Sequence, residues 1–469
     1  MPAHEQEELR EEIWADAVAQ AEAIRHGTVA AAELLDAYLD RVERLNPTLR
    51  AFVAIDESRA RRDASAVDDA VRTGKLDMLG PFAGVTISIK DVIDVEGLAT
   101  THSSKVLANN MAALDDPLVS RIRDAGFIVL GKTNVPEFCT SVTTSELNGV
   151  CRNPWDLART PAGSSGGAAV SVAAGLCAIA HGTDGAGSVR VPAAYGGLVG
   201  TKPTRGLVSF EPELGDGYYG AVVDGILSRS VRDAAAVLDV LAHPIELFAD
   251  GLSRDPSPLR IGVTIDPPFG GVDDECAGAA LAVGQVLAES GHRVDAATPS
   301  WSTILEAALG PMSVPGPAAL VPLELADQVE PRNRALIEHG HRVTVMQHAR
   351  WVALVRARST EFLALWNDID VLVTPTAPVL PPPVDFAPWH LSGQEHSARF
   401  MEFPLPSFTQ PFNLTGQPAI SLPLAWSADG LPIGVQLVGR RGEEMVLFQL
   451  ACQLERALPW RGRRPSSVD

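Results

Sequence analysis

Apolar residues in the first part of the chain recur at the spacing of one helix face. The repeat comprises Leu34, Leu35, Tyr38, Leu39, Val42 and Leu45. Thr28 is a candidate N-cap for this helix, because its hydroxyl can accept a hydrogen bond from a free backbone N–H group. The pattern therefore predicts a helical region up to about Leu45.

From Gly84 onward, short apolar runs alternate with helical patterns. The predicted strands cover Val85–Ile89, Phe127–Leu130, Arg260–Ile265, His292–Ala296, Val371–Thr374, Ala419–Trp426 and Ile433–Val438. Predicted helices cover roughly Asp274–Ser290 and Glu443–Ala457, and Asp429-Gly430 is a turn signal. Strands that alternate with helices favour an α/β fold, with a mixed central sheet covered by helices on both faces.

The chain contains no internal repeat and no obvious linker. A proline-rich stretch, TPTAPVLPPPVDFAPW, is semi-rigid and is expected to wall a cleft rather than join domains. We therefore expect one domain over residues 1–469. Within it we distinguish a helical N-terminal region at 1–78, a core at 79–240 and the remaining sheet and pocket segments at 241–469.

Composition and charge exclude several classes of partner. The chain has 38 basic and 58 acidic residues, a net charge of −20, and this balance repels nucleic acid and anionic membranes. Its five cysteines are scattered and form no CxxC pair, which indicates neither a disulfide framework nor a zinc site. From the charge we expect no nucleic-acid and no membrane partner. Because the N-terminus is acidic and polar, unlike a secretion signal, we expect a cytoplasmic protein.

Two short motifs suggest other chemistries. GFIVLGKT at 126–133 matches the P-loop pattern, but Phe127–Leu130 is itself a predicted strand, and Asn134-Val135-Pro136 follows where a helix should begin. GSSGG at 163–167 matches the nucleophile elbow of α/β-hydrolases, with Ser165 as the nucleophile. A proline-containing loop precedes it where that fold needs a buried strand, so the elbow is kept only as a minor alternative.

Three longer segments together resemble the amidase signature family. They are GVTISIKDVIDVEGLATTHSS with Lys90, RTPAGSSGGAAVSVAAG with Ser164 and Ser165, and GTDGAGSVRVPAAYGGLVGTKPT with Ser188. The spacing between Ser164 and Ser188 is similar to that of the family. The segments GKTNVPEF, RNPWD and NLTGQPAISLPL extend the resemblance to nearly the whole chain.

Attack by a serine requires a base, and these segments contain no histidine in a suitable place, which leaves lysine. A solvated lysine has a pKa of about 10.4 and is charged at neutral pH, but burial lowers that pKa. Lys90 closes a strand that should be buried. The resemblance implies that Ser188 is the nucleophile and that Ser164, at a cis peptide bond, bridges it to Lys90. It implies no metal and no other cofactor.

The resemblance also assigns the residues around the nucleophile. The oxyanion hole is expected at Gly185, Ala186, Gly187 and Ser188, where backbone N–H groups precede the nucleophile. Ser165, Thr183 and Asp184 are expected to hold this turn and the bridging serine by hydrogen bonds. Arg190 is expected to pair with Asp184 in a structural role.

The expected reaction is hydrolysis of the C–N bond of an aryl, oligomeric or xenobiotic amide. Carbamate or ester hydrolysis by the same residues is an alternative. A second alternative is the catalytic subunit of a tRNA-dependent amidotransferase. Such subunits carry a basic Gly-x-Glu-Val-x-Arg-Arg run, which this chain lacks. The candidate pocket residues are Cys139, Leu305, Met312, Phe403 and Phe408. This largely apolar set predicts a bulky or aromatic substrate, and the resemblance implies a monomer or homodimer.

Overall fold

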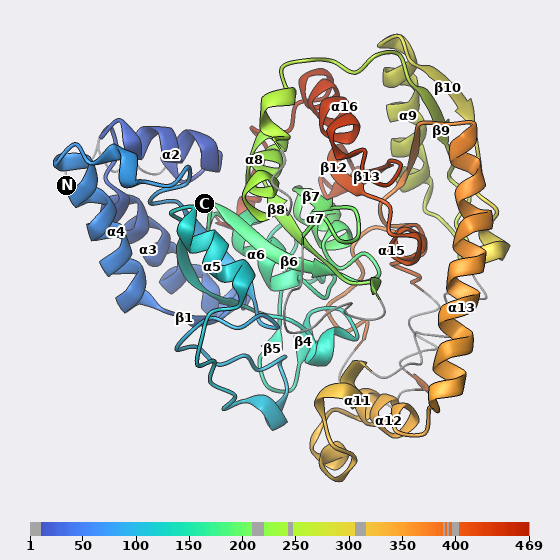
Figure 1. Ribbon diagram of the computed structural model, residues 1–469, viewed down its shortest axis with the longest axis horizontal. Coiled ribbons are helices and arrows are strands. Elements are labelled where there is room, and N and C mark those ends of the chain that lie inside the picture. Colours follow the sequence, from blue (N-terminus) through green and yellow to red (C-terminus); the bar gives the residue numbers. More distant parts are fainter. Residues whose placement is uncertain are drawn as a thin grey trace.

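An eleven-stranded mixed sheet forms the centre of the protein (Figure 1). The computed structural model describes residues 11–208, 220–242, 247–304, 316–387, 390–391, 394–395 and 403–468. In spatial order the strands are β1 (Phe52–Ile55), β3 (Ile128–Thr133), β2 (Thr86–Lys90), β6 (Ile179–Asp184), β8 (Val223–Ser228), β7 (Val199–Lys202), β12 (Ala419–Trp426), β13 (Pro432–Val438), β11 (Val371–Pro375), β9 (Arg260–Val263) and β10 (Arg293–Ala296). Strands β3, β2 and β6 are parallel neighbours, as are β11, β9 and β10, and the other pairs are antiparallel.

Helices cover both faces of this sheet. They are α2 (Ala17–Arg25), α3 (Ala31–Leu49), α4 (Glu57–Arg72), α5 (Pro117–Asp124), α6 (Gly166–Ala173), α7 (Arg190–Gly196), α8 (Val231–Leu241), α9 (Asp274–Glu289), α11 (Gly316–Leu320), α12 (Pro331–Gly340), α13 (Val345–Phe362), α15 (Gln410–Thr415) and α16 (Glu444–Ala457). Alternate residues of β12 point to opposite faces. Ile420 joins the buried cluster that contains Phe448 of α16, whereas Ser421 lies beside Ala194 of α7. The predicted α/β fold is confirmed.

The N-terminal helices α2, α3 and α4 pack together at the β1 end of the sheet (Figure 1). The predicted apolar face of α3 is buried at Leu34, Leu35, Tyr38 and Val42. The predicted N-cap is wrong, because α3 begins at Ala31 and Thr28 donates instead to the carbonyl of Ala23. The carboxylate of Asp68, from α4, accepts the N–H groups of Ala31 and Ala32 at 2.7 and 3.0 Å. A tertiary contact therefore supplies the cap that the local sequence lacks.

The other predicted elements agree with the structure to within a few residues. Strand β3 extends through Gly131-Lys132-Thr133, so the GKT of the P-loop pattern is buried strand and not a phosphate loop. Lys132 is fully buried and forms an ion pair with Asp91 at 3.2 Å. No helix within the described ranges is long and apolar enough to cross a membrane.

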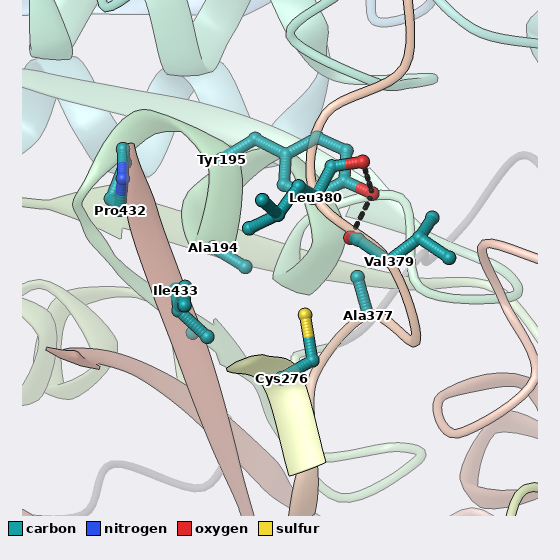
Figure 2. A pocket seen from close by; sticks show the side chains of 9 residues that line it. Ala194, Tyr195, Cys276, Ala377, Val379, Leu380, Pro432 and Ile433 are labelled. Carbon is teal, nitrogen blue, oxygen red and sulfur yellow. Dashed lines mark hydrogen bonds between the residues drawn. The ribbon is translucent and has the colours of Figure 1, made fainter. Parts of the chain in front are cut away.

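A small apolar hollow lies between α7, α9 and β13 (Figure 2). Its lining residues are Ala194, Tyr195, Cys276, Ala377, Val379, Leu380, Pro432, Ile433 and Gly434. The Tyr195 hydroxyl donates to the carbonyl of Val379 at 2.8 Å, which ties α7 to the proline-rich stretch. That stretch also accepts the N–H of Thr160 at the carbonyl of Pro382, so it runs beside the segment that leads to Ser164. None of the predicted catalytic residues lines the hollow, and we regard it as a packing space.

Candidate active site

Lys90 is the last residue of β2, between β3 and β6, and its side chain is fully buried. Its Nζ atom lies 2.7 Å from Ser164 Oγ, 2.7 Å from Thr183 Oγ1 and 3.2 Å from the carbonyl oxygen of Thr183. Burial lowers the pKa of Lys90, while the nearby Cys139 thiol and Asp184 carboxylate act in the opposite direction. The fold therefore favours the neutral amine, which is the form that can accept a proton.

These contacts suit a neutral amine as well as an ammonium group. A neutral amine has two N–H donors and one lone pair, whereas the carbonyl of Thr183 can only accept. Lys90 can donate to both oxygen atoms of Thr183 and accept from the hydroxyl of Ser164. The arrangement therefore allows a proton to pass from Ser164 to Lys90.

Ser164 follows a cis peptide bond from Gly163, as expected from the sequence resemblance, and it is buried in the loop before α6. A Cβ atom at position 163 would lie 2.4 Å from the carbonyl oxygen of Ser141, so only glycine fits there. The next residue, Ser165, is fully buried, and its N–H donates to the carbonyl of Ser188 at 3.1 Å. Because Ser165 is inaccessible and no strand precedes it, the geometry disfavours the nucleophile-elbow alternative.

Ser188 lies on a tight turn between β6 and α7 and is half-buried. The carboxylate of Asp184 holds this turn by accepting the backbone N–H groups of Gly187, Val189 and Arg190 at 2.7, 3.2 and 3.3 Å. Gly187 has a φ of +121°, which glycine adopts most easily. A carboxylate inside the turn thus fixes the backbone on both sides of Ser188.

Arg190 pairs with Asp184, as predicted, and both side chains are fully buried. The guanidinium has five N–H donors and all five are used. Two donate to Asp184, and the others donate to the carbonyl of Thr409 and to the side chains of Gln436 and Asn413. Burial alone would raise the pKa of Asp184, but the charge and hydrogen bonds of Arg190 hold that pKa well below its usual range.

No motif or spacing in the sequence singles out Thr409, Asn413 or Gln436. Asn413 donates to the carbonyl of Asp184 at 2.7 Å and to its carboxylate at 2.9 Å, and Thr409 Oγ1 donates to the carbonyl of Ala186 at 2.6 Å. Asn413 begins the NLTGQPAISLPL segment, and this was the one signal for it in the sequence.

The four residues of the predicted oxyanion hole differ in whether their backbone N–H groups already have an acceptor. The N–H of Gly187 donates to Asp184, so it is committed to holding the turn. Those of Gly185, Ala186 and Ser188 donate to no acceptor within the described residues, and they are available to a ligand.

The predicted pocket residues have different environments. Cys139 is partly exposed and lies near enough to Lys90 to act on its pKa. Phe403 is half-buried and packs edge-on against Phe386, with ring centroids 4.8 Å apart. Phe408 is fully buried, so its ring is part of the core. Leu305 and Met312 lie outside the described residues.

A buried lysine bonded to one serine, near a second serine on a tight turn, is the arrangement of a serine hydrolase whose base is an amine. The Amidase family model matches residues 33–448. The chain belongs to the amidase family and is an enzyme that acts on amide C–N bonds.

Three similar proteins show where it lies in that family. The chain is 38% identical to a 6-aminohexanoate-cyclic-dimer hydrolase of Paenarthrobacter ureafaciens over 98% of both chains. It is 34% identical to an acylamidase of Rhodococcus erythropolis over 97% of both chains. A solved structure of a 6-aminohexanoate cyclic dimer hydrolase with its substrate has a TM-score of 0.89 at 36% identity, covering 97% of this chain and 100% of that one. The chain thus groups with free-standing amidases rather than with amidotransferase subunits.

Proposed function

We propose that the protein cleaves amides through an acyl-enzyme on Ser188, with Ser164 as the proton relay and Lys90 as the base. The observation that carries the proposal is the 2.7 Å contact between the buried Lys90 Nζ and Ser164 Oγ. An exposed lysine would be charged and could not accept a proton, whereas burial lowers the pKa of Lys90 and so favours its neutral form.

In the proposed reaction, the Ser188 oxygen attacks the amide carbonyl while its proton passes to Ser164 and the proton of Ser164 passes to Lys90. The N–H groups of Gly185, Ala186 and Ser188 stabilise the oxyanion of the tetrahedral intermediate. The proton then returns from Lys90 through Ser164 to the leaving nitrogen, because an amine leaves poorly unless it is protonated. Water attacks the acyl-enzyme by the same route and releases the acid.

For the substrate, we propose an oligoamide with a flexible apolar acyl chain, such as a dimer of 6-aminohexanoate. The names of the relatives support this class. Phe403 supports it as well, because its half-buried ring packs against the buried apolar cluster that contains Ala162, two residues before Ser164. Methylene groups packed on the accessible part of this ring would supply binding energy of about 0.8 kcal/mol per buried CH₂.

We further infer a cytoplasmic enzyme, active as a monomer or homodimer, whose partners are small-molecule substrates. The net charge of −20 supports the absence of nucleic-acid and membrane partners. Size measurement at several protein concentrations would decide between monomer and dimer.

The proposed function is tested with a panel of substrates followed by mass spectrometry. The panel contains a cyclic and a linear oligoamide, an anilide, an aryl ester, an aryl carbamate and glutamine. We expect the wild type to cleave an oligoamide or the anilide, Ser188→Ala to be inactive, and Ser290→Ala, at an exposed serine, to match the wild type. Undiminished turnover by Ser188→Ala would refute the mechanism, and preference for the carbamate or ester would refute the substrate class.

A further inference from the structure

The stretch that carries Cys139 has an unusual backbone. Phe138 and Cys139 have φ angles of +51° and +62°, although neither is glycine. Each such residue costs roughly 1–3 kcal/mol and persists only where its surroundings enforce it. The short helix η3 (Glu137–Cys139) must therefore be held by contacts from elsewhere in the fold.

Many of those contacts come from one lobe, defined here as residues 316–340, which contains α11, η7 (Leu323–Gln328) and α12. The lobe lies at one end of the molecule, away from the N-terminal helices (Figure 1). Its Asn333 donates through Nδ2 to the Glu137 carboxylate at 2.6 Å and to the Glu137 carbonyl at 3.1 Å. Its Oδ1 accepts the hydroxyl of Thr140 at 2.6 Å. One buried amide therefore bonds to both ends of the strained stretch.

Further polar contacts surround this amide. The Glu137 carboxylate also accepts the backbone N–H of Glu330 at 2.9 Å and the hydroxyl of Ser104 at 2.8 Å. Glu330 forms an ion pair with Arg332 at 2.9 Å, and each of these side chains is only 2% exposed. The acidic groups thus face a positive charge and several donors inside the protein, as buried charges require.

The lobe also holds the stretch by apolar packing. The ring of Phe138 is buried in a cluster with Val321, Ala326, Val329 and Ile337, all from the lobe. The side chains of two consecutive residues, Glu137 and Phe138, are therefore anchored in the lobe.

On its other side, the same segment contacts the loop that carries Ser164. The carbonyl oxygen of Ser141 lies against Gly163, directly before Ser164, and Cys139 lies near enough to Lys90 to act on its pKa. Further along, the N–H of Thr143 donates to the carbonyl of Ala162 at 2.9 Å, and Thr143 Oγ1 accepts the N–H of Gly166 at 3.0 Å. Residues 137–144 therefore connect the lobe to Lys90 and to the loop that presents Ser164.

We propose that the lobe is a clamp that positions the active site, and that Asn333 is its central positioning residue. The clamp keeps Cys139 near Lys90 and keeps residues 141–143 against the loop of Ser164. The proposal rests on the proposed roles of Lys90 and Ser164, and it adds a determinant that lies far from them in the sequence. Loosening the clamp should affect the chemical step more than the initial binding of substrate.

The test compares Asn333→Ala with Glu338→Gln in the full chain. Glu338 lies on the same helix and forms one partly exposed ion pair, with Arg334. The first readout is the alkylation rate of Cys139 by iodoacetamide, followed on its peptide by mass spectrometry. Cys151 and Cys177 are buried, and burial raises the pKa of Cys177 to about 11, so these two thiols report global unfolding. We expect Asn333→Ala to speed alkylation of Cys139 about tenfold, as loss of a buried hydrogen bond to a charged group implies, and Glu338→Gln to leave it unchanged.

The second readout is steady-state kinetics on the best substrate of the panel. We expect Asn333→Ala to lower kcat about tenfold and to change KM less than kcat. Thr140→Val is a nearly isosteric change that removes one hydroxyl, which is bound to Asn333 and also contacts the Glu137 carbonyl and Arg332. It should move both readouts in the same direction, and it serves where Asn333→Ala exposes the buried thiols. Unchanged Cys139 reactivity in a folded variant, or equal effects from Glu338→Gln, would overturn the clamp. An inactive wild type would instead refute the proposed function, and the alkylation rates would still decide the clamp.

Discussion

Replacing Asp184 with asparagine tests the turn that carries Ser188. The side chain keeps its shape but loses its charge, and one oxygen atom becomes an NH₂ group. Asp184 Oδ2 accepts the N–H groups of Val189 and Arg190 and the Nε–H of Arg190 at 2.9–3.3 Å. An NH₂ group at this position would face three donors and could bond to none of them.

The expected loss follows from burial of the ion pair. Asp184 and Arg190 are both fully buried, and removal of one partner of such a pair destabilises a protein by about 3–5 kcal/mol. Total stabilities are about 5–15 kcal/mol, so Asp184→Asn should remain folded at low temperature with a clearly lower free energy of unfolding. It should also be nearly inactive, because the backbone around Ser188 loses its anchor.

The assay is unfolding by guanidinium, followed by tryptophan fluorescence, together with turnover of the best substrate. The matched control is Asp295→Asn, whose ion pair with Arg293 is exposed and should contribute little. We expect the midpoint of Asp184→Asn to fall strongly and that of the control to stay close to the wild type. Equal midpoints for the two variants, or full activity of Asp184→Asn, would refute this account of the turn.

Three further predictions concern the candidate catalytic residues. Lys90→Met and Ser164→Ala should each lower kcat by about 10²–10⁴. Because the two residues act as one relay, kcat of the double variant should be little lower than that of either single variant, and additive losses would contradict this. Burial lowers the pKa of Lys90, and the reaction needs its neutral amine, so kcat/KM should rise with pH and level off below about pH 10. A rise centred at the ordinary lysine pKa of about 10.4 would contradict the burial argument. Gly187→Ala should abolish activity, since its Cβ would lie 2.1 Å from Thr409 Oγ1, whereas Gly278→Ala on α9 meets no atom within 4 Å and should retain full activity.

The sequence predicts most strands because apolar runs and turn residues are local signals. Strand β12 has the predicted bounds, and β13 differs by one residue at its start. The cap of α3 could not be predicted in this way, because Asp68 reaches it from another helix. Local patterns identify an element, whereas tertiary contacts decide which group satisfies its ends.

In the candidate site, too, local patterns predict some residues and tertiary contacts decide the others. Lys90, Ser164 and Ser188 stand in recognisable segments, and the pairing of Asp184 with Arg190 could be expected from their proximity in the chain. The contacts of Asn413 and Asn333 could not be expected in this way, because they form only after distant parts of the chain pack together. A polar residue in a helical or loop segment gives no local sign that folding will bury it against a carboxylate.

If Ser188 is the nucleophile, an acyl group must be bound to it during turnover, and the mass of the enzyme reveals such a group. An aryl ester is mixed with excess enzyme, the reaction is quenched in acid within milliseconds to seconds, and the modified peptide is sequenced by mass spectrometry. We expect one acyl group on Ser188, and no such group on Ser188→Ala. An acyl group on Ser165 or Cys139 in the active wild type, or turnover with no acyl group at any time point, would contradict this role of Ser188.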